Sequence, residues 1–241
     1  GVAPVGGFAY TVCNGITAAS GSTQISVTAV NDAPLSTSGA ATGAEDSTIG
    51  VSLAGTDIDG TVTSVTVTAL PANGALLLAD GVTAVSANQV LTAVQAANLL
   101  FRPAANFNGS SSIGFTVTDN AGAVSSPAPF AITVTPVNDP PLAADDTVGT
   151  VAQAPVSFAV LGNDSDVDGD VITVAGASVN AALGTIVVNA DGTLTFTAAP
   201  GVSGPVVVTY TITDPSGAAD TATLTVNVTP PPAVTVDGPA L

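Results

Sequence analysis

Histidine, lysine, methionine and tryptophan are missing from the 241 residues, which include one arginine, Arg102, and one cysteine, Cys13. Histidine general bases, Schiff-base lysines and histidine metal sites are therefore excluded. Paired carboxylates remain as a route to glycoside hydrolysis. Only 4% of the residues are aromatic, so the ring surfaces on which sugars usually stack are scarce. We expect no enzymatic activity, and one cysteine provides no internal disulfide framework.

Positive charge is almost absent, because 18 acidic residues face a single base and the net charge is −17. A surface of this sign repels nucleic acid and anionic membranes. The longest apolar runs, such as "ALLLA" at 75–79, are too short to span a bilayer, so no membrane insertion is expected within this segment. All the acids except Glu45 are aspartates. Short acidic side chains in loops suit a hard divalent cation, which would also relieve their mutual repulsion.

What the chain does contain is repetition. Three segments alternate an aromatic residue with β-branched residues and end in a polar turn: "GGFAYTVCNG" (6–15), "SSIGFTVTDN" (111–120) and "VVVTYTITDP" (206–215). A second alternating run follows each of them: 23–32, 130–139 and 222–231. Period-two alternation of this kind predicts half-buried antiparallel strands. Tyr10, Phe115 and Tyr210 occupy matching places in these strands and are predicted to lie in the core.

The repeats predict an all-β chain of tandem Greek-key β-sandwiches, each of about seven short strands, arranged as a rod. Complete sandwiches are expected at 34–139 and 140–229. Residues 1–33 provide the closing strands of an incomplete sandwich, and 230–241 form a proline-rich extended tail. Helix-like spacing occurs at 92–100, where a short helical turn is expected. Asp-Gly pairs at 80–81 and 191–192 are typical of hairpin turns.

Acid and amide side chains recur where one sandwich would join the next. Asn-Asp occurs in both linkers, at 31–32 and 138–139, and Asp-x-Asp-Gly follows the second strand of each complete unit, at 57–60 and 166–169. In a seven-strand sandwich these segments meet at the end facing the preceding linker. Each joint should therefore collect about five to eight oxygen-bearing side chains, and calcium takes roughly six to eight oxygen ligands. Asp170 stands beside the second set.

The linker "NDAP" or "NDPP", an acidic residue before the second strand, Asp-x-Asp-Gly and an aspartate after the sixth strand together resemble the bacterial cadherin-like and Ig-like tandem repeats of large secreted, biofilm-type adhesins. The resemblance covers nearly the whole chain. It implies that calcium at the joints stiffens an extracellular stalk. The implied ligands at the first joint are Asn31, Asp32, Asp57, Asp59 and Asp119, and those at the second are Glu45, Asp46, Asn138, Asp139, Asp166, Asp168 and Asp214.

Departures from this pattern are found in the last complete unit, 140–229. The two Asn-Asp linkers are 107 residues apart. If this offset holds along the chain, Ala152 and Gln153 stand where Glu45 and Asp46 stand in the unit 34–139. The following linker, 228–239, has no Asn-Asp, so the calcium series should end there. Asp145 and Asp146 have no counterpart in the unit 34–139, and the pattern assigns them no role.

The function expected is that of a structural stalk at the bacterial cell surface, serving cell or surface adhesion with neighbouring repeats of the same chain as its partners. Two alternatives remain. One is a module that binds a glycan or a protein. The other is a self-assembling filament in which other copies of the chain complete residues 1–33 by strand donation, with 232–241 as a candidate donor. The faces left to cover would be those of Phe8, Tyr10, Val12, Ile25 and Val27.

Overall fold

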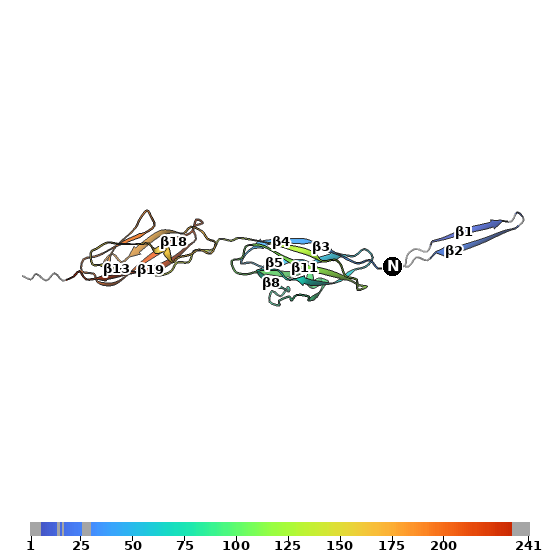
Figure 1. The fold of residues 1–241 in the computed structure, drawn as a ribbon, viewed down its shortest axis with the longest axis horizontal. Coiled ribbons are helices and arrows are strands. Elements are labelled where there is room, and N and C mark those ends of the chain that lie inside the picture. Colours follow the sequence, from blue (N-terminus) through green and yellow to red (C-terminus); the bar gives the residue numbers. More distant parts are fainter. Residues whose placement is uncertain (1–5, 14, 16, 26–29, 233–241) are drawn as a thin grey trace, which may run out of the picture. The chain divides into compact units, whose positions relative to one another are not determined.

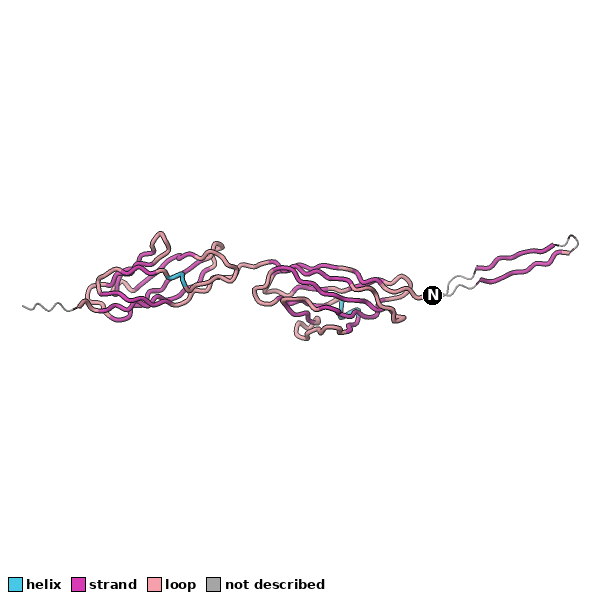
Figure 2. The backbone as a smooth tube through the Cα atoms, in the orientation of Figure 1, coloured by secondary structure: helices cyan, strands magenta, loops and turns pink. Residues whose placement is uncertain are grey.

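The computed structural model describes residues 6–13, 15, 17–25 and 30–232, and it divides into two compact units, Gly1–Val137 and Asn138–Leu241. Strands make up nearly all of the regular structure in the described residues (Figures 1 and 2). The exceptions are one turn of α-helix, α1 (Ala93–Ala96), and a 3-10 turn, η1 (Val160–Gly162). None of the described helices is long and apolar enough to cross a membrane. The predicted all-β class is confirmed.

A two-stranded hairpin lies near the start of the chain. Strands β1 (Gly6–Cys13) and β2 (Ala18–Ile25) pair antiparallel in continuous register. Tyr10 and Val12 are 51% and 63% exposed, so the prediction of Tyr10 as a core residue is wrong for the hairpin as described. Strands β1 and β2 form a single layer, which cannot enclose a side chain. The side chains of Phe8 and Ile25, and Val27, lie outside the described residues.

The first sandwich, defined here as residues 30–137, contains more strands than predicted. Its ten strands are β3 (Leu35–Thr37), β4 (Gly39–Ala44), β5 (Ile49–Val51), β6 (Ala54–Thr56), β7 (Val62–Ala69), β8 (Gly74–Leu77), β9 (Val90–Thr92), β10 (Leu99–Pro103), β11 (Gly109–Asp119) and β12 (Ala128–Thr135). A five-stranded sheet, β4-β12-β11-β7-β9, faces a three-stranded sheet, β5-β10-β8, while β3 pairs with β6.

Breaks in two strands and one insertion explain the difference from about seven. The first strand changes partners, since β3 pairs antiparallel with β6 and β4 pairs parallel with β12. The second strand is interrupted between β5 and β6 at Leu53, which is buried and donates its backbone N–H to Ala96 O. The insertion contributes β9 and α1, which confirms the helical turn expected at 92–100. Thr92 and Gln95 form a capping box at its start.

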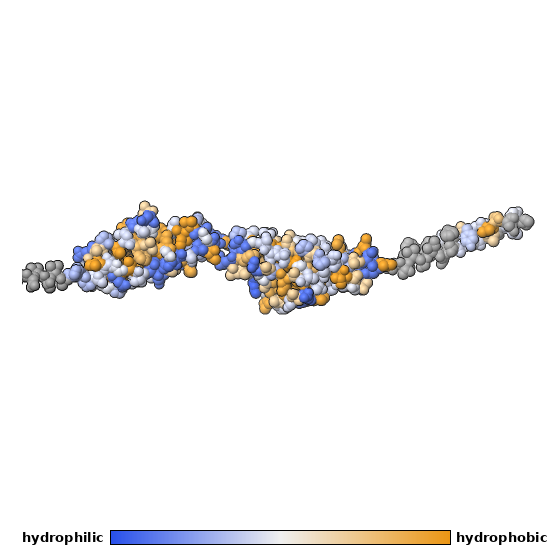
Figure 3. All heavy atoms as spheres, in the orientation of Figure 1, coloured by the Kyte–Doolittle hydropathy of each residue, from blue (hydrophilic) through white to orange (hydrophobic). Residues whose placement is uncertain are grey.

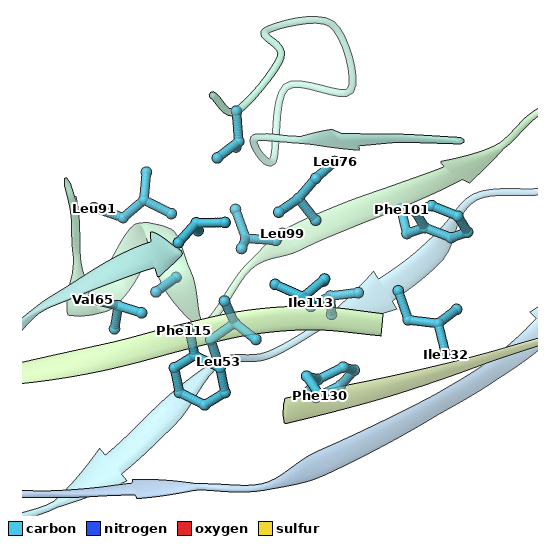
Figure 4. Packing of buried hydrophobic residues seen from close by; sticks show 14 of the residues in the cluster. Leu53, Val65, Leu76, Leu91, Leu99, Phe101, Ile113, Phe115, Phe130 and Ile132 are labelled. Carbon is cyan, nitrogen blue, oxygen red and sulfur yellow. The ribbon is translucent and has the colours of Figure 1, made fainter. Parts of the chain in front are cut away.

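The core of the first sandwich forms where the two sheets meet. Leu76, Leu99 and Phe101 project from β8 and β10 toward side chains of the five-stranded sheet (Figure 4). Ile113 and Phe130 are among those they meet, and all of these side chains are at most 4% exposed. The alternation that places every second side chain inward thus builds one continuous apolar layer.

The second sandwich, defined here as residues 138–232, has the seven strands predicted. They are β13 (Asp146–Val151), β14 (Val156–Phe158), β15 (Thr173–Val179), β16 (Gly184–Val188), β17 (Leu194–Ala198), β18 (Gly204–Thr213) and β19 (Ala219–Thr229). The sheet β13-β19-β18-β15 faces the sheet β14-β17-β16. Between them lie buried residues that include Phe196, Val208 and Tyr210.

The two sandwiches share one strand frame, which their registers show residue by residue. Gly39 pairs with Phe130 in the parallel β4–β12 ladder, and Asp146 pairs with Leu224 in the parallel β13–β19 ladder. Predicted equivalences hold as well, because Glu45 N donates to Thr135 O and Ala152 N donates to Thr229 O. The 107-residue offset at these positions is confirmed.

The two Asp-Gly pairs have the turn geometry that the sequence predicts. Gly81 and Gly192 have positive φ values of 70° and 82°, and each follows an aspartate whose Oδ1 accepts backbone N–H groups of the same turn. The two Asp-Gly pairs therefore form turns, as predicted. Phe115 and Tyr210 are fully buried, which confirms them as core residues. On the face drawn in Figure 3, hydrophobic and hydrophilic residues are interspersed over both sandwiches.

Candidate metal-binding clusters

The first cluster joins the linker before the first sandwich to loops of that sandwich. Asn31 Nδ2 donates to Asp119 Oδ2 at 2.8 Å and to Asp32 O at 3.1 Å. The backbone N–H of Asp32 donates to Asp59 Oδ2 at 3.2 Å. Asp59 lies in the turn after β6, and Asp119 is the last residue of β11. Four of the five residues predicted for the first joint are thus linked by hydrogen bonds.

Asp57 completes this set and has the least satisfied carboxylate in it. Both of its Oδ atoms are buried and accept no hydrogen bond. A Cβ at Gly60 would collide with Asp57 Oδ2 and with Asn120 Oδ1, so a larger residue would displace these two side chains. Two shielded carboxylate oxygens without a donor are costly unless a cation or a proton compensates them. Asn120 Oδ1 also accepts from Thr61 N at 2.8 Å.

The second cluster repeats these contacts within the second sandwich. Asn138 Nδ2 donates to Asp214 Oδ2 at 2.6 Å and to Asp139 O at 3.0 Å. The backbone N–H of Asp139 donates to Asp168 Oδ2 at 2.8 Å. Each bond has its counterpart in the first cluster, atom for atom. Two linkers separated by 107 residues are therefore fastened to their sandwiches in the same way.

Asp166 occupies the place of Asp57 in the second cluster. Its Oδ1 accepts from Asp168 N at 2.9 Å and from Asp170 N at 3.4 Å, while its buried Oδ2 accepts no hydrogen bond. The pKa of Asp170 is raised, first by desolvation and then by repulsion from Asp166, Asp214 and Asp168. Asp170 therefore lies within the electrostatic reach of the cluster, as the sequence predicted by position.

Asp119 and Asp214 sit at the centre of the two clusters and are only 2% and 5% exposed. Asn31 and Asn138, respectively, are the main cause that lowers the pKa of each carboxyl below its ordinary value. Backbone N–H groups of the following turn lower it further, against the opposing effect of desolvation. Both carboxylates are held in the ionised form, in which they can bind a cation.

Comparison with known proteins agrees with the duplicated frame. The family model described as Bacterial Ig domain matches residues 31–133 and, a second time, residues 138–227. The chain belongs to the bacterial Ig domain family. Its resemblance to bacterial Ig-like and cadherin-like tandem repeats is thereby confirmed. A search of curated proteins gives no match.

Among solved structures, human CDH23 EC21-23 is 13% identical, with 82% of this chain and 70% of that one covered and a TM-score of 0.53. PcdhgB3 EC1-4 is 16% identical, with 95% and 58% covered and a TM-score of 0.50. These likenesses show a cadherin-like fold. An endo-fucoidan hydrolase of glycoside hydrolase family 107 has a TM-score of only 0.32, and this chain spans 34% of its length, so the match supports no conclusion about activity.

Glu45 and Asp46 lie at the other end of the first bacterial Ig domain. Glu45 is 1% exposed, and its Oε1 accepts from Val137 N at 2.8 Å, while its buried Oε2 accepts no hydrogen bond. Asp46 is exposed and has a positive φ of 58°. Both belong to the first unit, so their predicted grouping with Asn138, Asp139 and the aspartates of the second domain stays a prediction.

The donor set of each cluster suits a hard cation, since carboxylate, amide and backbone oxygens are the ligands that calcium prefers. The unpartnered oxygens of Asp57 and Asp166 are the structural sign of that fit. In the part of the chain that the structure describes, no three acidic or cysteine side chains are gathered closely enough to hold an ion as they stand. An ion would therefore require these side chains to lie closer together than they do here.

Sequence reasoning missed one group of acids in the second domain. Asp146 and Asp164 lie within 3.0 Å and 3.4 Å of the Tyr210 hydroxyl, while Asp145 and Asp220 accept hydrogen bonds from Thr223 N and Ala143 N. The signal was present in the unplaced pair Asp145-Asp146 and in the Asn-Asp that precedes "SDVDGD". Their shared neighbour could not be identified without the pairing of β13 with β19.

Proposed function

We propose that each linker cluster binds calcium and that the ion fastens the linker to the bacterial Ig domain that follows it. The observation that supports this is the repetition of the same linker contacts at Asn31 and Asn138. An Asn-Asp pair that merely ended a strand would not need the same three bonds to loops distant in sequence. Unpartnered oxygens at Asp57 and Asp166 add an unmet need for positive charge.

In the first cluster the residues expected to hold calcium are Asn31, Asp32, Asp57, Asp59 and Asp119, and in the second they are Asn138, Asp139, Asp166, Asp168, Asp170 and Asp214. The ion supplies two positive charges, which neutralise carboxylates that otherwise repel one another. The side chains from the linker then become fixed to those of the domain. The linker loses conformational freedom, so its stiffness depends on calcium.

A chain of bacterial Ig domains with calcium-dependent linkers fits an extracellular stalk. We infer that this segment spaces an adhesive part of a larger protein from a bacterial surface, with neighbouring repeats as its direct partners. The family and the cadherin-like fold support this role. The high net negative charge is compatible with it, since calcium at the linkers would offset part of the repulsion along the chain.

Isothermal titration of the 241-residue chain with calcium tests the proposal. We expect Asp57→Asn to weaken binding at the first cluster and Asp166→Asn to weaken it at the second, each by about tenfold or more, equivalent to about 1.4 kcal/mol. Asp191→Asn, in an exposed hairpin turn, is the matched control and should leave both sites unchanged. Absence of calcium binding, or an equal loss in the control, would contradict the proposal.

Small-angle scattering tests the stiffening separately. With calcium present the pair-distance distribution should extend further than it does with a chelator, because ordered linkers limit bending. Addition of calcium after the chelator should restore the longer distribution. Identical profiles under both conditions would remove the mechanical part of the proposal even if calcium binds.

A second candidate function is supported by the hairpin β1–β2. Tyr10 and Val12 lie on one face of paired strands and are exposed, whereas Phe115 and Tyr210 at the matching positions are fully buried. A strand supplied by another copy would cover this face, which would make the chain a filament subunit. Light scattering in calcium decides the matter for the 241-residue chain, since a monodisperse monomer excludes this mode of assembly.

A further inference from the structure

The second bacterial Ig domain contains a buried tyrosine hydroxyl with more acceptors than it can satisfy. Tyr210 on β18 is 0% exposed. Its hydroxyl lies 2.7 Å from Ala144 O, 3.0 Å from Asp146 Oδ2 and 3.4 Å from Asp164 Oδ1. The three acceptors come from the start of β13 and from the loop after η1, so the contact ties both segments to the sheet.

If every carboxylate is ionised, the single proton of the Tyr210 hydroxyl cannot satisfy both Ala144 O and Asp146 Oδ2. A phenol has a single O–H, and its shortest contact is to Ala144 O, which can only accept. Asp146 Oδ2, at 3.0 Å, then faces a lone pair of the same oxygen. A proton on Asp146 removes this conflict, because the carboxylic acid donates to Tyr210 Oη while Tyr210 donates to the carbonyl.

Among the described residues, no cationic side chain acts on Asp146. The charged and titratable groups facing Asp146 are Asp164 and Asp145, both acids, and Tyr210. Asp164 Oδ1 accepts from Ala144 N at 2.8 Å, and its Oδ2 is buried without a partner. Asn163 approaches with a neutral amide. The single arginine of the chain, Arg102, belongs to the other unit.

Asp145, although adjacent, is bound quite differently. Its Oδ1 accepts from both the N–H and the hydroxyl of Thr223, at 2.8 Å and 2.9 Å. These bonds lower the pKa of Asp145, so its negative charge persists beside Asp146. Asp220 on β19 likewise accepts from Ala143 N at 2.9 Å, and that bond lowers its pKa. Asp145 and Asp220 thus stay ionised.

We propose that Asp146 is a carboxylic acid in the folded second domain over a pH range in which Asp145 and Asp220 are ionised, and that its O–H donates a hydrogen bond to Tyr210 Oη. Asp146 then acts as a proton-dependent clasp between β13 and β18. Burial is the main cause that raises its pKa, and repulsion from Asp164 and Asp145 adds to it, against the lowering effects of Tyr210 and Asn163.

The consequence is a stability that depends on pH in this domain. A group whose pKa is raised by folding contributes its full stabilisation below its unfolded value, and the contribution is lost as pH rises through the folded value. Each unit of difference between the two corresponds to about a tenfold change in the folded-to-unfolded ratio. Acid should therefore tighten the second domain at Asp146, in a pH range above the ordinary aspartate value.

The first domain provides an internal control, because Phe115 replaces Tyr210 and has no hydroxyl to bind. Gly39 and Asp146 hold matching places in the parallel ladders. A Cβ at Gly39 would lie 2.6 Å from the Phe130 ring, so that position has no room for a carboxylate.

Carbon-13 NMR of the side-chain carboxyls tests the proposal directly on the 241-residue chain, in buffer with a calcium chelator. We expect Asp146 to titrate above the ordinary aspartate value of about 3.9. Asp145 and Asp220 in the same domain should titrate below it. A midpoint for Asp146 at or below the ordinary value would overturn the proposal. So would a second titration in millimolar calcium in which the ion displaces the proton, since the cluster would then be a cation site.

Urea unfolding gives an independent readout. The chain has no tryptophan and two tyrosines, so a Tyr10→Phe background leaves Tyr210 fluorescence as a probe of the second domain alone. Asp146→Asn keeps an N–H donor for Tyr210 Oη at every pH. The parent should lose stability as pH rises above the ordinary aspartate value, and Asp146→Asn should lack this decline and be the more stable of the two once the parent's carboxyl is ionised. Equal pH slopes in parent and variant would refute the clasp, and Asp191→Asn serves as the control.

Discussion

The two bacterial Ig domains of this chain share the same strand arrangement. They differ in the side chains at one corner of the sandwich, which we define by Ser36 and Ser125 in the first domain and by Ala143 and Asp220 in the second. In the first, Ser36 and Ser125 share a buried hydroxyl contact of 2.5 Å, and Ser125 Oγ accepts from Val117 N at 2.9 Å. In the second, Asp220 stands in the strand region where Ser125 stands and accepts from Ala143 N. A neutral hydroxyl pair in one domain is therefore replaced by a carboxylate in the other.

Gly55 shows why the first domain has no room at this corner for acids such as Asp146 and Asp164 of the second domain. A Cβ at Gly55 would lie 2.7 Å from Leu35 O and from a methyl of Val117, so this corner is closed by close packing. The second domain keeps the space and fills it with Tyr210, Asp146 and Asp164. The linker contacts, by contrast, are the same in both domains. Interior residues thus diverge while the strand frame and the hydrogen bonds of the linker are kept.

The largest expected effect tests whether the two domains fold independently. Phe115→Ala removes a fully buried ring from the first domain and should destabilise that domain by about 3–5 kcal/mol. In the Tyr10→Phe background, Tyr210 fluorescence during urea unfolding should keep its midpoint, because it then reports only the second domain. Amide hydrogen exchange would follow the first domain in the same sample. A shift of both together would show that the domains are coupled.

A smaller effect should follow from the corner itself. Ser125→Ala leaves the buried N–H of Val117 and the hydroxyl of Ser36 without their shared partner. An unsatisfied buried polar group costs about 1–3 kcal/mol, so the first domain should lose stability by that amount. The measurement is amide exchange in β11, with Ser47→Ala, an exposed serine, as the control. An unchanged exchange rate would mean that water replaces the lost bond.

The insertion found only in the first domain can be tested at its capping box. Thr92→Ala removes the side-chain acceptor of Gln95 N at the start of α1. A lost N-cap costs about 1 kcal/mol, and the loss should be confined to the first domain. Urea unfolding followed by circular dichroism gives the size, and Thr92→Ser, which keeps the hydroxyl, should restore most of it. Equal losses in both variants would point to packing of the methyl group instead.

The smallest expected effect is that Asp214 and Asp146 of the second domain change the pH dependence of stability in opposite directions. Folding lowers the pKa of Asp214, so its contribution is present above the unfolded value and is lost as pH falls through the folded one. Asp214→Asn should therefore reduce the loss of stability on acidification, whereas Asp146→Asn reduces the loss on alkalinisation. Tyr210 fluorescence measures both series. Slopes of the same sign would break the distinction between the two sites.

Strand periodicity and turn residues were sufficient to predict much of this protein. Alternation at 111–120 and 206–215 marks central strands because every second side chain must be buried in a sandwich. The recurrence of Asn-Asp at 31–32 and 138–139, with Asp-x-Asp-Gly downstream, pointed to linker residues and loop aspartates that are joined by hydrogen bonds, whereas the grouping of Glu45 and Asp46 with the second set stays a prediction. Local patterns of this kind are visible in sequence because a strand or a turn imposes its spacing on consecutive residues.

Only the tertiary structure decided where acids outside that pattern belong and which oxygens lack partners. Asp146, Asp164 and Asp220 are distant in sequence, and each could have been a solvated loop charge. The parallel pairing of β13 with β19 and the position of β18 bring Asp146 and Asp164 to one tyrosine hydroxyl, where burial raises the pKa of Asp146. Sequence determined the frame of each domain because spacing is local. The protonation of its interior depends on distances between segments, which only folding sets.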